Sequence, residues 1–167
     1  MTQLCKLPLD ALKSRLAAHT AGRRPHLPFV LVSHVPWTET EPDDSLYAAL
    51  CEHHENNAPW EGAGRHLLID SQGTFWIDPD SAWLPAIGVR GPDSEPTPAM
   101  IDMAVDPGQS RLGLRNQLQS VAAALLAISD AFELDEVPSV RWQSIRLRPE
   151  SSMPDSNALP TALCGGI

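Results

Sequence analysis

Residues 60–74 read Trp60-Glu61-Gly62-Ala63-Gly64-Arg65-His66-Leu67-Leu68-Ile69-Asp70-Ser71-Gln72-Gly73-Thr74. A glycine-rich approach leads into an apolar run at 67–69, which is typical of a buried strand. The segment 70–73 then offers a tight turn, because glycine adopts positive φ angles and Asp and Ser side chains bond to nearby backbone. A second strand-forming run follows at 74–77. The stretch therefore predicts a β-hairpin, around which the rest of the chain is organised.

Strand and helix patterns alternate on both sides of this hairpin. Helices are expected at 8–19, 45–57 and 114–132, and further strands at 29–32, 99–105 and 139–147. The long helix carries an apolar stripe that is expected to lie on the sheet: Leu114, Leu118, Val121, Leu125, Ile128 and Phe132. This alternation predicts an α/β fold, a single domain with a central mixed β-sheet packed by helices. We expect an N-terminal helix and linker at 1–28, the domain at 29–160 and a tail at 161–167.

Composition narrows the class of protein. The chain has 167 residues, of which 43% are hydrophobic and 20% charged, as in ordinary soluble domains. Its formal net charge of −9 argues against nucleic acid as a partner, since nonspecific binding needs clustered Lys and Arg. The three scattered cysteines form no C-x-x-C pair, which argues against a disulfide scaffold or a zinc knuckle.

The sequence also bears on location. The segment 1–20 lacks the apolar core of a signal peptide, and no run approaches the roughly 18 apolar residues of a membrane span. We therefore expect cytoplasmic synthesis without a signal peptide, and no membrane partner. Delivery to a cell wall, or incorporation in a particle, would then depend on another component.

Two groups of residues carry candidate chemistry. His34 follows the strand at 29–32 and is well placed for chemistry; the alternative is a partly buried, hydrogen-bonded histidine. Cys51 and His54 lie at i and i+3 on the predicted helix and could reach one metal ion, and the alternative is a solvated helix end. A nucleophilic Cys51 beside His53 and His54 is a further hypothesis, which helix geometry disfavours because i and i+2 neighbours do not face each other.

The hairpin stretch resembles a segment of the peptidoglycan amidases and peptidoglycan recognition proteins, W-x-D-x-G-Y-H-F-x-I-x-x-D-G-T. It matches without a gap at Trp60, Gly64, His66, Ile69, Gly73 and Thr74, and conservatively at Glu61 and Leu67. Arg65 departs from the pattern, because the family has tyrosine there. The order of the expected elements is also similar to that of the family. His34 matches the strand-end histidine, 99–105 the S-I-G-I strand, and 114–132 with Gln117 the long helix, so the resemblance covers about 29–160.

The resemblance implies a zinc-dependent N-acetylmuramoyl-L-alanine amidase fold with a degenerate catalytic site. Family members hold zinc with two His and a Cys or Asp, and the metal lowers the pKa of the attacking water. Here His34 is the only metal ligand at a family position, because the partners are replaced at Ser144 and Met153. The positions of the family's lysine and tyrosine hold Ser151 and Arg65. One imidazole does not hold catalytic zinc, so we expect no cofactor, and zinc only if the protein is an active amidase.

Three hypotheses about function follow from the resemblance. The first is a pseudoenzyme that binds peptidoglycan fragments (muropeptides) in a groove. The residues expected to line that groove are His34, Trp37, Trp60, Arg65 and His66, with Trp83 as a further wall. Arg65 could pair with a stem-peptide carboxylate, since a guanidinium binds such groups in a bidentate manner. The second is a structural component of a larger protein assembly such as a phage particle or a delivery machine. The third is an active amidase with a rearranged site.

Overall fold

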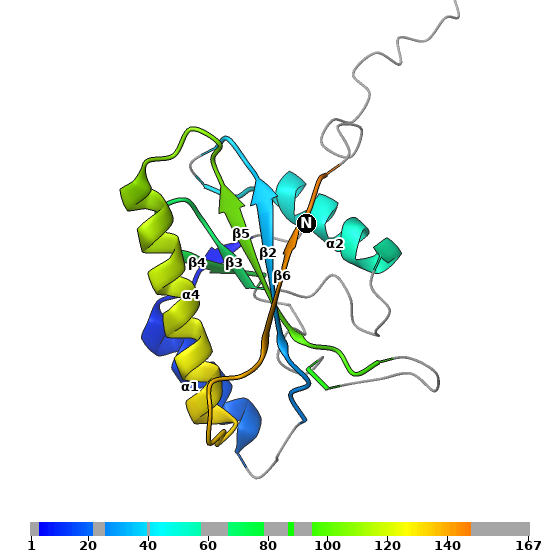
Figure 1. Ribbon diagram of the computed structural model, residues 1–167, viewed down its shortest axis with the longest axis vertical. Coiled ribbons are helices and arrows are strands. Elements are labelled where there is room, and N and C mark those ends of the chain that lie inside the picture. The colour runs from blue at the N-terminus through cyan, green and yellow to red at the C-terminus, as the bar shows by residue number, and fades with distance from the viewer. Residues whose placement is uncertain are drawn as a thin grey trace, which may run out of the picture.

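The computed structural model describes residues 4–21, 26–39, 41–57, 67–78, 87–88 and 95–147. Within these ranges it contains three helices and one six-stranded sheet, with the strand order β1-β4-β3-β5-β2-β6 (Figure 1). The elements are β1 (Cys5–Lys6), α1 (Leu9–Thr20), β2 (Val30–Pro36), α2 (Asp44–Asn57), β3 (Leu67–Ile69), β4 (Phe75–Ile77), β5 (Ala99–Val105), α4 (Arg111–Ala131) and β6 (Val140–Ser144). The predicted α/β class with a mixed sheet is confirmed.

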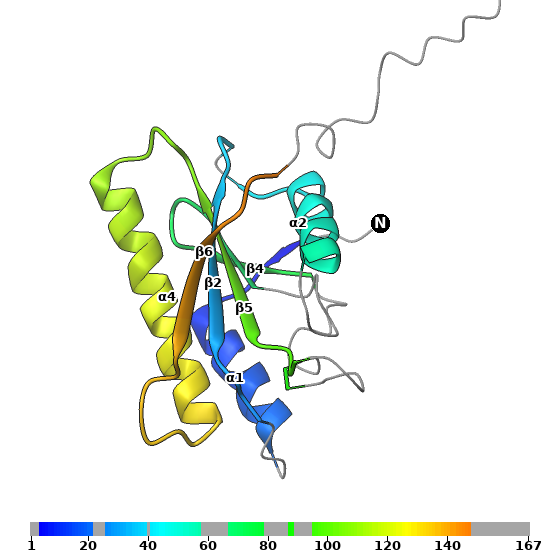
Figure 2. The same cartoon turned by 45° about the vertical axis from the view of Figure 1, so that its right-hand side comes forward.

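The strand directions explain why helices cover both faces of the sheet. The strands β3, β5, β2 and β6 are parallel neighbours, whereas β4 runs antiparallel to β3 and to β1. Helix α2 follows β2 and leads past β5 to β3, and α4 follows β5 and leads past β2 to β6. Right-handed crossovers in opposite directions place their helices on opposite faces. Figure 2 shows α4 and α1 on one face of the sheet and α2 on the other.

The face under α1 and α4 holds the larger core. Leu12 and Leu16 of α1 are fully buried against sheet residues such as Val32 and Ile101. Helix α1 therefore shares one hydrophobic core with the sheet. None of the helices in the described part of the chain is long and apolar enough to cross a membrane.

The second face is covered by α2. The helix is capped by Asp43, whose carboxylate accepts a hydrogen bond from the Leu46 N–H at 2.9 Å. Leu46 and Leu50 are fully buried in a core that includes Val35 of β2 and Ile145, which follows β6. These two leucines hold α2 on this face of the sheet.

The predicted hairpin is formed by β3 and β4, joined by a turn at 70–74. The Asp70 carboxylate accepts hydrogen bonds from the Thr74 N–H and the Trp76 indole N–H, each at 2.8 Å. Gly73 has a φ of 85°, a conformation in which a side chain is strained. Ser120 of α4 donates a hydrogen bond to the Gly73 carbonyl at 2.6 Å. The turn is therefore docked on the long helix.

The orientation of α4 differs from the expectation in one respect. Leu114 and Leu118 were expected to lie on the sheet, but they are 42% and 44% exposed. The first half of α4 packs instead on the hairpin turn, where a Cβ built at Gly113 would lie 3.3 Å from the Ser71 carbonyl. This packing turns the two leucines outward, so that prediction was wrong for the start of the stripe. Val121 and Ile128 further along are buried as expected.

Candidate functional site

The carboxyl ends of β2 and β5 form the switch point of the sheet, because the chain leaves these neighbouring strands toward opposite faces. Ligands in open α/β sheets bind outside such a point. His34 lies near the end of β2 and is exposed, and its register partner on β6 is Ser144, which is also exposed. The Ile145 N–H donates to the His34 carbonyl at 2.8 Å, which fixes the register. The structure thus places the side chains of His34 and Ser144 side by side on one face.

This face is the one that α4 covers in part. Val30 and Val32 of β2 lie in the core beneath α4, and the two-residue period of a strand puts His34 on the same side. By the same register Trp142 of β6 is the partner of Val32, yet its side chain is 58% exposed. The corner of this face beside β6 is therefore open to solvent. We call the exposed side chains His34, Trp142 and Ser144 the strand corner.

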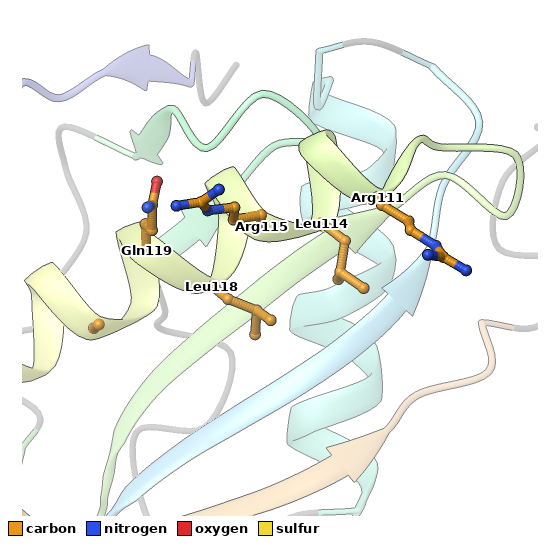
Figure 3. Close-up of a pocket in the computed structure, with 6 residues that line it drawn as sticks. Arg111, Leu114, Arg115, Leu118 and Gln119 are labelled. Atoms are coloured by element: carbon orange, nitrogen blue, oxygen red, sulfur yellow. The ribbon is translucent and has the colours of Figure 1, made fainter.

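The adjoining surface of α4 is apolar and basic. Arg111, Leu114, Arg115, Leu118, Gln119 and Ala122 line a shallow groove of about 390 Å³. In Figure 3, Leu114 and Leu118 point to one side of the helix, and Arg115 and Gln119 point to the other. Two arginines on a chain of net charge −9 favour an anionic group at this groove.

A buried amide network holds the loop between β5 and α4. Gln117 is fully buried and donates to the Ala104 carbonyl at 2.7 Å, and its own carbonyl accepts from Gln109 at 2.8 Å. The side-chain carbonyl of Gln109 in turn accepts a hydrogen bond from the Asp106 backbone N–H at 3.2 Å. The sequence pointed to Gln117 only through the family resemblance. The structure gives it a positioning role, because it fixes the loop that borders the switch point.

The expected groove residues are only partly accounted for. Trp37 is half-buried against the α2-side core, and its indole N–H donates to the Glu41 carbonyl at 3.3 Å, so it has a packing role. Trp60, Arg65, His66, Trp83 and Met153 lie outside the described residues. Of the predicted site, the structure therefore brings together His34 and Ser144.

The donor set at this corner does not fit the zinc of the resembling family. His34 offers one imidazole, and the group beside it is the hydroxyl of Ser144, which is a poor zinc ligand. Among the described residues, no three His, Cys, Asp or Glu side chains are close enough to share a metal ion. Cys51 and His54, the candidate metal pair on α2, therefore have no third ligand of this kind within the described residues.

No protein-family model, no curated protein and no solved structure matches this chain.

A second cluster lies beneath α2 on the opposite face. His54 Nε2 is 3.2 Å from an Asp102 carboxylate oxygen, and the two side chains are 2% and 0% exposed. Burial lowers the pKa of His54, but the charge and hydrogen bond of Asp102 outweigh it, so the pKa is raised above its usual value. The interpretation as a solvated helix end was wrong for His54, whereas the helix residues 55–57 after it are exposed. The available signal was Asp102 itself, a carboxylate inside an apolar strand, which requires a buried partner.

The neighbours of this pair do not form a nucleophilic site. The pKa of Cys51 is raised to about 11, chiefly by burial; a Tyr47 hydrogen bond lowers it, and nearby carboxylates such as Glu55 and Asp102 raise it. A thiol with such a pKa stays protonated at neutral pH and is a weak nucleophile. The geometry therefore does not support the hypothesis that Cys51 is catalytic.

Proposed function

We propose that this domain binds peptidoglycan fragments on an amidase-like scaffold and does not hydrolyse them through zinc. One observation carries the proposal: His34 and Ser144 occupy directly paired positions on adjacent parallel strands. In the resembling family these two strand ends supply histidines, so their adjacency here supports the alignment made from the sequence. The same adjacency leaves a hydroxyl where a second imidazole would be needed.

The strand corner has the chemistry for such a ligand. Trp142 offers an exposed apolar ring, and aromatic rings commonly pack against sugars and lactyl or alanyl methyl groups because both are partly apolar. His34 and Ser144 offer hydrogen-bond donors and acceptors beside it. Arg111 on the neighbouring groove, together with Arg65 from the sequence alignment, could pair with the carboxylate of a stem peptide.

Binding can be tested by pull-down on insoluble peptidoglycan and by titration with soluble muropeptides. Trp142→Ala is expected to weaken binding by about tenfold, since a buried aromatic contact contributes about 1–2 kcal/mol. Leu126→Ala is the matched control, because Leu126 is also 58% exposed but lies in the second half of α4. The Trp37→Ala, Arg65→Ala double variant tests the groove expected from the sequence. Absence of muropeptide binding by the intact protein would end the proposal.

A second candidate function is that of an interaction module in a larger assembly. The observation in its favour is that Trp142 sits on β6, an edge strand whose outer side is not paired within the described residues. Unprotected edges are templates for pairing with another chain. Light scattering after size-exclusion chromatography separates the two candidates. A monomer that binds muropeptides supports the first, and a stable oligomer without glycan affinity supports the second.

A further inference from the structure

A pocket of about 540 Å³ lies between α2 and the segment that follows β6, lined by Ala49, Glu52, His53, Asn56, Asn57, Arg146 and Leu147. The α2 residues follow the i, i+3, i+4, i+7 spacing of one helix face, so their side chains project in one direction. Arg146 and Leu147 line the pocket from the segment after β6. Its volume falls within the range of small-ligand sites.

The polar groups of this pocket are mostly uncommitted. Asn57 is used locally, because its side-chain amide donates to the His53 carbonyl at 2.8 Å. By contrast, within the described ranges the side chains of Glu52, Asn56 and Arg146 make no hydrogen bond or ion pair. Glu52 and Arg146 thus carry opposite charges on one pocket without neutralising each other.

His53 adds a group that can both donate and accept. Its ring meets that of His54 edge-on, with the centroids 5.6 Å apart. Burial and the neighbouring His54 lower the pKa of His53, against the raising effect of Asp102. At neutral pH the imidazole is therefore neutral, with one N–H donor and one free acceptor nitrogen.

We propose that this pocket binds a short zwitterionic peptide such as a dipeptide, with Arg146 on the carboxylate and Glu52 on the ammonium group. The carboxamide of Asn56 and the imidazole of His53 then bind the intervening amide. Two opposite charges held apart on one pocket match such a ligand, because each end of it meets a group of the other sign. None of these residues belongs to the strand corner, so the inference stands independently of muropeptide binding there.

The test is calorimetric titration of the full chain with a panel of free dipeptides, beginning with Ala-Ala. Each is compared with its N-acetylated form, which lacks the ammonium, and its C-terminal amide, which lacks the carboxylate. Arg146→Gln is expected to weaken binding of the free dipeptide at least about tenfold, as expected for loss of a hydrogen bond to a charged group. Arg15→Gln is the matched control, because Arg15 is exposed on α1, which lies on the other face of the sheet from α2.

Comparing the loss of affinity for each form of the dipeptide identifies which residue binds which end of the ligand. Glu52→Gln should weaken binding of the free dipeptide but leave the affinity for its N-acetylated form unchanged. Arg146→Gln should leave the affinity for the C-terminal amide unchanged. Thermal melts show whether each variant is folded. The inference is overturned if no dipeptide of the panel binds the intact protein, or if Arg146→Gln and Arg15→Gln have the same effect. Loss of muropeptide binding in Trp142→Ala with dipeptide binding retained would separate this pocket from the strand corner.

Discussion

His54 Nε2 lies 3.3 and 3.2 Å from the two carboxylate oxygens of Asp102, although the residues are 48 positions apart in the sequence. The carboxylate stands in the middle of β5, with Ser33 and Leu68 as register partners on either side. The pair therefore ties the last part of α2 to the centre of the sheet. A buried charge without its partner is strongly destabilising, so each residue requires the other.

Asp102→Asn is expected to lower the free energy of unfolding by about 3–5 kcal/mol, because it leaves the buried imidazole without its counter-charge. Urea unfolding followed by circular dichroism measures the change. Asp130→Asn is the control, since Asp130 is exposed at the end of α4 and should change stability by less than about 0.5 kcal/mol. Equal stabilities of the two variants would show that the pair contributes nothing.

The same pair makes stability depend on pH. Burial opposes the charged imidazole of His54, but Asp102 raises the pKa overall above 6.5. The folded protein therefore binds this proton more tightly than the unfolded chain. The contribution is full below the unfolded pKa of about 6.5 and is lost as the pH rises through the folded-state value.

The measurement is the difference in unfolding free energy between the natural protein and His54→Gln. This difference should shrink as the pH is raised from about 6 to about 9. A difference that stays constant, or grows with pH, would contradict the assignment of a charged His54.

The sequence was informative where one face of an element is buried over its whole length. The strand at 99–105 and the helix at 45–57 were predicted within one or two residues, because apolar patterns persist through them. His54 was missed because its neighbours His53 and Glu55 are polar and stop signals follow at once. The compensating signal, Asp102, lies 48 residues further along, and a local pattern cannot connect the two.

The same limit explains the error on α4. An apolar stripe records which side of a helix is nonpolar, but it does not record what lies beneath each turn. Leu114 and Leu118 continue the stripe of Val121, yet their turns lie where α4 packs on the hairpin through Gly113 and Ser120. Crossing and docking of this kind arise from tertiary packing, so the exposed start of α4 could not be foreseen from periodicity.

Docking of the hairpin also makes Gly73 sensitive to substitution. Its φ of 85° strains any side chain, and an added Cβ would lie 2.8 Å from the Ser120 hydroxyl and 2.9 Å from the Asn116 carbonyl. Gly73→Ala is expected to destabilise the fold by about 1–3 kcal/mol. Gly108→Ala serves as the control, because its Cβ would meet only the Asp106 carboxylate at 3.5 Å. Chemical unfolding of both variants measures the change in stability. Similar losses of stability in Gly73→Ala and Gly108→Ala would refute the described docking.

The pairing of His34 with Ser144 gives the sharpest test of the amidase-like alignment. Register partners on adjacent strands have backbones about 4.8 Å apart, and both side chains here are exposed on one face. Ser144→His should therefore place two imidazoles within reach of one zinc ion. We expect zinc affinity to rise at least about tenfold over the natural protein, because two ligands act together.

Two variants decide whether this gain comes from the intended geometry. Adding His34→Ala to Ser144→His should return the affinity to that of the natural protein. Gln143→His places an imidazole one residue earlier on β6, where the strand alternation directs it to the opposite face and its present side chain donates to Ser33 at 2.9 Å. That variant should gain no zinc affinity through His34. Equal gains from Gln143→His and Ser144→His in zinc titration calorimetry would mean that the register, and the alignment built on it, is wrong.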